Sequence, residues 1–135
     1  MREEYTTPEL IEYPALTDVT GASTEPSDRS LKTGIAPIDQ QDVLSRVVDL
    51  PVSTWVYKRH PHVRHIGPMA QDFSAAFGVG KDDKTIYTVD ADGVAIAAIQ
   101  GLYELLQQKE AEIARQQAAL AALEARLAEL EKKLH

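Results

Sequence analysis

A serine and a lysine lie five positions apart in the segment EPSDRSLKTG, which spans residues 25–34. A serine hydroxyl becomes an effective nucleophile when a neighbouring base takes its proton. A lysine can be that base when burial, or a nearby cation such as Arg29, favours its uncharged form. Ser27 and Lys32 are therefore a candidate catalytic pair. Spacing alone favours a simpler interpretation, in which Ser27 or Asp28 caps a turn and Lys32 is solvated.

Three histidines, His60, His62 and His65, occur together in RHPHVRHIG. Three imidazoles can bind zinc, but no carboxylate or cysteine is spaced to complete the ligand set, and Pro61 interrupts the segment. We therefore predict a structural role for His65, with His60 and His62 exposed.

The segment DADG, residues 90–93, has the beginning of a calcium-binding loop. The twelfth position of such a loop, which has to be a glutamate, is Gly101. We predict a turn and a helix cap at this segment, and neither a metal nor another cofactor for the chain.

Composition limits the class of protein further. The chain has 135 residues, a formal net charge of −7 and no cysteine. Disulfides are therefore excluded, and the acidic balance argues against general affinity for nucleic acid or anionic lipid. The basic group Lys58, Arg59 and Arg64 is too small for a nucleic-acid interface. The longest apolar stretch, residues 94–99, is far too short to span a membrane.

The elements that position the candidate pair divide the chain into three parts. Residues 1–26 contain three prolines and six acidic residues, and we predict an extended acidic tail or linker. Residues 27–92 are predicted to form a small α/β body. Residues 93–135 have the pattern of one long helix. The predicted fold class is therefore α+β.

Within the body, a helix is predicted from Asp39, as its cap, to Pro51, with an apolar face formed by Val43, Leu44, Val47 and Leu50. Residues 52–57 indicate a strand, and residues 58–65 a loop or hairpin connection. A second helix is predicted over residues 68–78, beginning with a proline and ending with a glycine in the left-handed conformation.

The end of the body is predicted from weaker patterns. Residues 80–84 are charged and indicate a turn, and residues 85–89 indicate a second strand. Asp90 or Asp92 is expected to cap the final helix, which we expect to begin at Gly93.

The final helix carries the strongest pattern in the sequence. With Ile99 at heptad position a, apolar residues recur at alternating spacings of three and four, which predicts a parallel, left-handed coiled coil about 60 Å long. Polar Lys109 and Gln116 at position d would fix its register. Spacing allows a dimer or a trimer, and the alternative is a long helix folded against its own body. The expected contact residues are Ile99, Leu102, Leu106, Lys109, Ile113, Gln116, Leu120, Leu123, Leu127, Leu130 and Leu134.

The order of these motifs resembles a known family. The matching segments are, in order, SDRSLKTGIAPID, VSTWVYK, RHIGPMAQDF and YTVDADGVAIAAIQGLYELLQQKEAEI. They are similar to the C-terminal intramolecular chaperone domain of endosialidase tailspikes, which phage tail fibres, bacterial tail-fibre-domain proteins and the myelin regulatory factor share. The resemblance covers residues 27–113. It implies a domain that forms a homotrimer through a helical bundle and helps an upstream fibre shaft of the same chain find its three-chain register.

The resemblance also implies a single self-cleavage. It assigns the nucleophile to Ser27, the general base to Lys32 and the scissile bond to Pro26–Ser27. Many family members have arginine at the position of Ser30, whereas this chain has its arginine one place earlier, at Arg29.

The sequence thus predicts a trimerising intramolecular chaperone domain of a tail-fibre or tailspike-like protein that cuts itself. The alternatives are a trimerisation module that does not cut, and an adaptor whose acidic tail or basic loop docks another protein. Because only 26 residues precede the motif, we expect either a longer precursor with a fibre shaft or a stand-alone relative. The expected location is a virion tail fibre or, for a prophage-derived protein, the bacterial cytoplasm.

Overall fold

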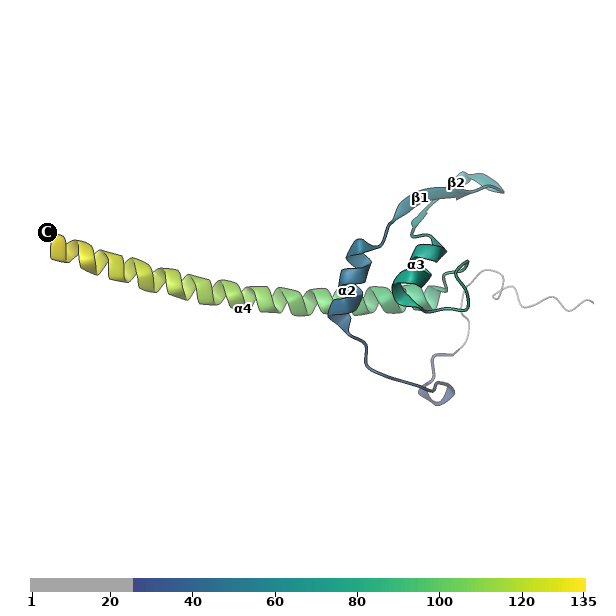
Figure 1. The fold of residues 1–135 in the computed structure, drawn as a ribbon, viewed down its shortest axis with the longest axis horizontal. Coiled ribbons are helices and arrows are strands. Elements are labelled where there is room, and N and C mark those ends of the chain that lie inside the picture. Colours follow the sequence, from purple (N-terminus) through teal and green to yellow (C-terminus); the bar gives the residue numbers. More distant parts are fainter. Residues whose placement is uncertain (1–25) are drawn as a thin grey trace, which may run out of the picture.

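The computed structural model describes residues 26–135 as a small body of helices and one hairpin, joined to a long C-terminal helix (Figure 1). This confirms the predicted α+β class. The acidic tail predicted for residues 1–26 lies outside the described residues, apart from Pro26. The elements are the 3-10 turn η1 (Arg29–Leu31), α2 (Gln40–Asp49), β1 (Ser53–Tyr57), β2 (His60–Gly67), α3 (Ala70–Phe77) and α4 (Thr88–Leu134).

Helix α2 begins and ends where its sequence signals predict. The Asp39 carboxylate accepts hydrogen bonds from the backbone N–H groups of Gln41 and Asp42, at 3.0 and 3.1 Å. These N–H groups have no partner inside the helix, so the cap stabilises its first turn. The helix stops just before Pro51. Its apolar face, centred on buried Val43, packs against α4.

Strands β1 and β2 form an antiparallel hairpin that projects from the helices (Figure 1). The prediction of a loop or hairpin connection over residues 58–65 was only partly right, because β2 occupies most of it. Pro61 and the polar residues weaken the strand pattern there, and an edge strand tolerates both. Trp55 pairs with His65 across the strands, and their rings stack with centroids 4.8 Å apart. Such aromatic pairs stabilise a two-stranded ribbon.

Helix α3 begins two residues later than predicted. Ala70, and not Pro68, is its first residue, and Met69 is the N-cap, because the Met69 carbonyl accepts the first helical hydrogen bond, from Phe73 N at 3.0 Å. The helix ends at Gly78, which has the predicted left-handed conformation with φ of 62°.

The strand predicted over residues 85–89 is wrong, and so is the expected start of the final helix at Gly93. Helix α4 begins at Thr88, since the Tyr87 carbonyl accepts from the N–H groups of Asp90 and Ala91 at 3.1 and 3.0 Å. Asp90 and Asp92 therefore lie inside the helix and do not cap it. An acidic residue in the first turn still interacts favourably with the helix dipole.

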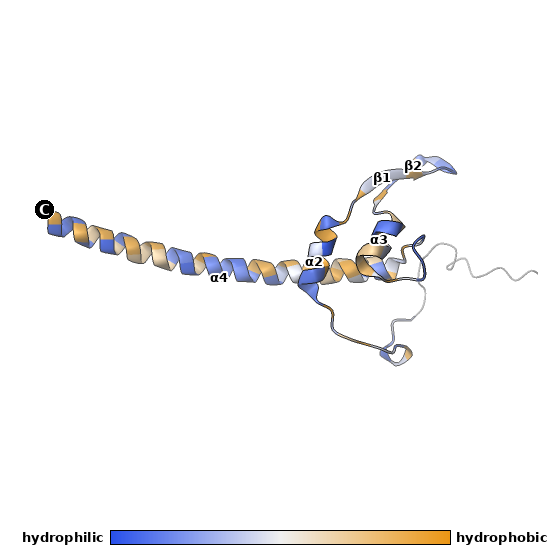
Figure 2. Ribbon diagram, viewed as in Figure 1, coloured by the Kyte–Doolittle hydropathy of each residue, from blue (hydrophilic) through white to orange (hydrophobic). Residues whose placement is uncertain are grey.

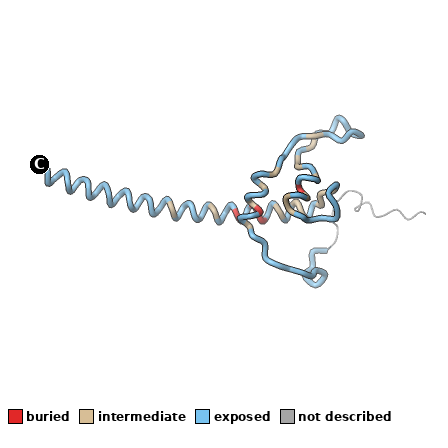
Figure 3. Tube along the Cα trace, viewed as in Figure 1, coloured by how far each residue is buried: buried red, intermediate tan, exposed pale blue. Residues whose placement is uncertain are grey.

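The hydrophobic core is small and lies where α2 and α3 meet α4 (Figure 3). Among the described residues, the buried apolar side chains are Val43, Phe73, Ala97 and Ala98. Gly101 permits the close approach of the two helices, because a Cβ atom there would collide with the Gln40 carbonyl oxygen. So small a core stabilises a domain weakly.

Most of α4 extends beyond the body, and its apolar residues continue to its end (Figures 1 and 2). The nine apolar residues at the predicted a and d positions are 50% to 84% exposed. The alternative of a helix folded against its own body is therefore wrong, because α2 covers a different face of α4. The exposed a and d residues, from Ile99 to Leu134, are called the seam below.

Candidate functional site

The structure brings Ser27 and Lys32 together. The Lys32 Nζ atom donates a hydrogen bond of 2.6 Å to Ser27 Oγ. This is the separation that proton transfer between a nucleophile and its base requires. In the arrangement seen here, the lysine is the donor. An uncharged Lys32 amine would accept the serine proton along the same line.

The turn η1 explains why a spacing of five residues brings the two side chains together. Asp28 caps the turn by accepting a hydrogen bond of 2.9 Å from Ser30 N. The N–H groups of Leu31 and Lys32 then donate to the carbonyls of Asp28 and Arg29, each at 3.2 Å. Asp28 is one of the two residues predicted to cap a turn here.

The same hydrogen bonding affects the Asp28 carboxyl group. Its pKa is lowered from the ordinary value, chiefly by the backbone N–H of Ser30 and then by the Ser30 side chain. The positive charge of Lys32 contributes less. Because hydrogen bonds to a carboxylate favour its charged form, the turn holds Asp28 as an anion beside the candidate pair.

The candidate pair lies on an extended arm, which we define as residues 26–39. Both Ser27 and Lys32 are exposed, and the arm runs away from α4 (Figure 1). Three large apolar side chains of the arm, Leu31, Ile35 and Ile38, are also exposed, at 68%, 68% and 60%. A catalytic lysine has to lose its proton, which burial favours. The single chain thus holds the pair in contact without enclosing it.

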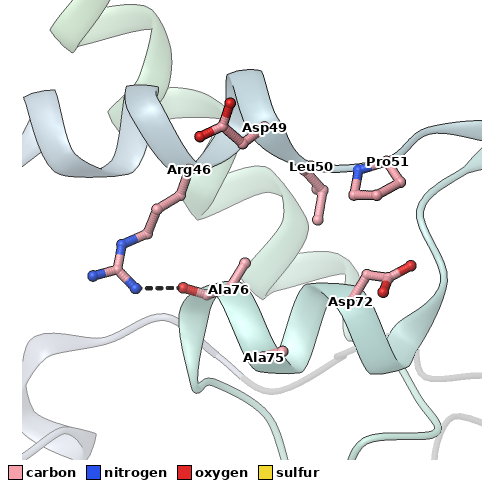
Figure 4. Close-up of a pocket in the computed structure, with 7 residues that line it drawn as sticks. All are labelled: Arg46, Asp49, Leu50, Pro51, Asp72, Ala75 and Ala76. Carbon is pink, nitrogen blue, oxygen red and sulfur yellow. Dashed lines mark hydrogen bonds between the residues drawn. The ribbon is translucent and has the colours of Figure 1, made fainter.

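A groove of about 340 Å³ lies between the end of α2 and α3 (Figure 4). The Arg46 guanidinium crosses it, donating to Asp42 Oδ2 at 2.8 Å and to the Ala76 carbonyl oxygen at 2.7 Å. Ala76 is in the last turn of α3, whose carbonyls have no helical partner, so this bond joins the ends of two helices. Neither Ser27 nor Lys32 lines the groove.

His65 has the structural role predicted for it. Its ring stacks on Trp55 and meets the Tyr57 ring edge-on at 5.3 Å, whereas His60 and His62 are exposed. No group of histidine and acidic side chains in residues 26–135 is placed to hold a metal ion. Within the same residues, no helix has the length and apolar character needed to cross a membrane.

Two polar residues interrupt the seam, as the heptad pattern predicts, and both bond to one glutamate. Lys109 Nζ lies 2.9 Å from Glu112 Oε2, and Gln116 Nε2 lies 3.4 Å from Glu112 Oε1. Polar residues at d positions cost stability if a slipped register buries them against leucine. Lys109, Glu112 and Gln116 therefore form one polar cluster on α4.

Sequence reasoning missed three hydrogen bonds that hold the body on α4. Gln41 Nε2 donates to the Gly101 carbonyl at 2.8 Å and to Glu104 Oε2 at 3.2 Å, and Gln40 bonds to Gln100 at 2.7 Å. The one available signal was Gly101 itself, since a glycine inside a strongly helical pattern often marks a close approach.

The comparisons with known proteins bear on the N-terminal part of the described chain. Residues 27–78 match the model of a peptidase family described as chaperone of endosialidase. A search of curated proteins gives no match to the chain. The matched segment contains η1, α2, the hairpin and α3, and it begins at Ser27. The match confirms the resemblance of residues 27–78 to the chaperone-of-endosialidase family, which the motifs predict, and it supports a chaperone-domain role.

Proposed function

We propose that this domain joins three chains through α4, acts as the intramolecular chaperone of a tail-fibre or tailspike-like protein, and cuts its own chain once at Pro26–Ser27. The observation that carries the proposal is the 2.6 Å hydrogen bond between Lys32 Nζ and Ser27 Oγ. It links the two residues to which the family resemblance assigns the nucleophile and the base. The family match supports the chaperone role.

The cleavage proceeds in two balanced steps. Ser27 Oγ attacks the carbonyl carbon of Pro26 while uncharged Lys32 accepts the hydroxyl proton. The bond between that carbon and the Ser27 nitrogen then breaks, and the proton passes to the nitrogen. The Pro26 acyl group is left as an ester on the Ser27 oxygen. Water hydrolyses the ester, which gives a C-terminal carboxylate at Pro26 and a free N-terminus at Ser27.

This reaction needs no separate substrate pocket. The nucleophile and the carbonyl that it attacks belong to adjacent residues, so proximity supplies much of the rate enhancement. Backbone N–H groups near the Pro26 carbonyl would stabilise the negative charge that develops on its oxygen. Because the bond is in the same chain, each chain reacts once.

Assembly is the step that encloses the pair. In one chain, the arm exposes Leu31 and Ile35, and α4 exposes the seam. Exposed apolar surface of this extent marks an interaction site. When three chains associate, the arm is pressed against neighbouring surfaces and Lys32 is desolvated, which favours its uncharged form. Cleavage therefore follows assembly.

The test is the intact mass of the purified chain during one day of incubation. We expect the wild type to yield two fragments, the second of which begins at Ser27. Ser27→Ala and Lys32→Met should remain at full length and still assemble. Ser30→Ala is the matched control, because it removes a hydroxyl from the same turn but leaves the pair intact, and it should cut.

A wild-type chain that assembles but stays at full length would contradict the cleavage step and leave the assembly step standing. The exposure of Ser27 and Lys32 in the single chain is the observation that favours this second candidate, a structural trimerisation module. In either case, the upstream fibre shaft would belong to a longer precursor of the same chain.

A further inference from the structure

A second apolar row runs beside the seam on the first part of α4. Val89, Ile96 and Tyr103 are spaced by seven residues and are 53%, 57% and 59% exposed. With Ile99 at position a, all three occupy position e, at one edge of the seam. We call these three residues the e-edge row.

The e-edge row ends where the body ends. The next residues at position e are Glu110, Gln117, Glu124 and Glu131, all polar or charged. Charged residues at e are typical of a coiled coil whose edges face water. Apolar residues at e are thus confined to the part of α4 that carries the body, which indicates that something covers this edge only there.

The opposite edge of the seam lies beside α2. Ala98 and Leu105 occupy position g, where Ala98 is 7% exposed and Leu105 is half-buried. Ala98 belongs to the core in which Val43 of the same chain's α2 packs on α4. In parallel helices, the g edge of one chain faces the e edge of the next. The α2 helix beside the g edge therefore comes to lie next to the neighbour's e-edge row.

We infer that α2 of each chain packs on the e-edge row of the neighbouring chain, so that every α2 helix bridges two α4 helices. Helix α2 offers an apolar side chain for this contact. Val48 is 75% exposed and lies one turn beyond Leu44, which packs against the core. The inference rests on the proposed parallel assembly and adds a second interface, made by the body, to the one made by the seam.

The contact also joins the arm to the assembly. The arm leads directly into α2 through the Asp39 cap, so fixing α2 between two α4 helices fixes the end of the arm. Among the helices and strands that the structure describes, α2 packs against α3 and α4 of its own chain.

The first test is sedimentation equilibrium over a concentration series with Ile96→Gln. Losing a buried isoleucine from every chain should raise the concentration for half-assembly by about tenfold or more. The control is Ile66→Gln on the hairpin, which removes an equally large and 75% exposed side chain and should leave the series unchanged. Far-UV circular dichroism checks that both variants keep their helices.

The results separate the two proposals. A wild-type chain that does not assemble at all would remove the proposed function and this interface with it. A wild type that assembles equally well with Ile96→Gln would overturn the interface alone.

Cross-linking gives a second measurement that does not depend on destabilising the chain. The protein has no cysteine, so Val48→Cys can be combined with Ile96→Cys, or with Tyr103→Cys, without background. We expect mild oxidation of at least one pair to give covalent dimers and trimers, and the three single variants to give none. Assembled samples in which neither pair links two chains would contradict the interface.

Discussion

Two parts of α4, residues 94–105 and residues 106–134, share one heptad pattern but differ in their neighbours. The first part packs against α2 through small residues, Ala97, Ala98 and Gly101, which let the helices approach closely. The second part has its leucines at the a and d positions, and it packs against no other described element. In a single chain, α2 therefore covers one face of the first part, whereas no described element covers the second part. Under the proposed assembly, the second part of α4 would be covered only when chains associate.

The largest effect on assembly is expected when negative charges are introduced into the second part of α4. Leu120→Glu combined with Leu127→Glu should abolish assembly, because each buried leucine contributes about 2–5 kcal/mol and a buried carboxylate costs more. The readout is the mass by sedimentation equilibrium. Ala121→Glu combined with Ala128→Glu adds the same charge outside the seam and should still assemble. Equal behaviour of the two double variants would mean that the seam is not the interface.

A smaller effect is expected where α2 meets the first part. Gly101→Ala should destabilise the body by about 1–3 kcal/mol, since its Cβ atom collides with the Gln40 carbonyl oxygen. Gly93→Ala is the control, with open space around its Cβ atom, and should stabilise α4 by about 0.5–1 kcal/mol. Thermal unfolding followed by circular dichroism distinguishes them. Stabilisation by both variants would rule out the close approach.

The polar residues of the seam should affect specificity more than stability. Replacing Lys109 and Gln116 together by leucine should stabilise the assembly by on the order of 1 kcal/mol per chain and allow more than one stoichiometry or register. Native mass spectrometry reports the species present. A single species of lower stability would show that the bonds to Glu112 strengthen the seam instead of fixing its register.

The smallest effect concerns the arm, whose turn is fully exposed. The pKa of Asp28 is lowered from 3.8 in the folded turn, so the charged cap is fully present above pH 3.8 and is lost as the pH falls through the lowered pKa of the folded turn. The Ser30 amide resonance should shift in this acidic range. Asp28→Asn keeps a cap without the titrating charge and should not shift. The same titration in both chains would assign the shift to another group.

Local signals predicted much of the fold correctly. Asp39 and Gly78 determine the backbone conformation within three or four residues of themselves, so the helix ends that they mark can be predicted from the sequence alone. Strand β2 was predicted only as part of a loop or hairpin connection, because its residues are polar and its partner strand supplies the stability. The start of α4 was misplaced because residues 85–89 have strand-forming side chains but no strand to pair with.

Only part of the candidate site could be predicted from the sequence. The spacing of Ser27 and Lys32 fits a solvated turn as well as a catalytic pair, and the resemblance of the surrounding motifs was needed to favour chemistry. Their hydrogen bond depends on the turn that Asp28 caps. The fit of Gly101 against Gln40 depends on the packing of two helices 60 residues apart, which no local pattern encodes.

The proposal that the seam joins three chains is tested most directly by sedimentation equilibrium of the Ser27→Ala chain, which keeps every molecule at full length. We predict a mass three times that of the 14.9 kDa chain at micromolar concentration. A mass of one chain, with the helical signal of α4 undiminished, would contradict it.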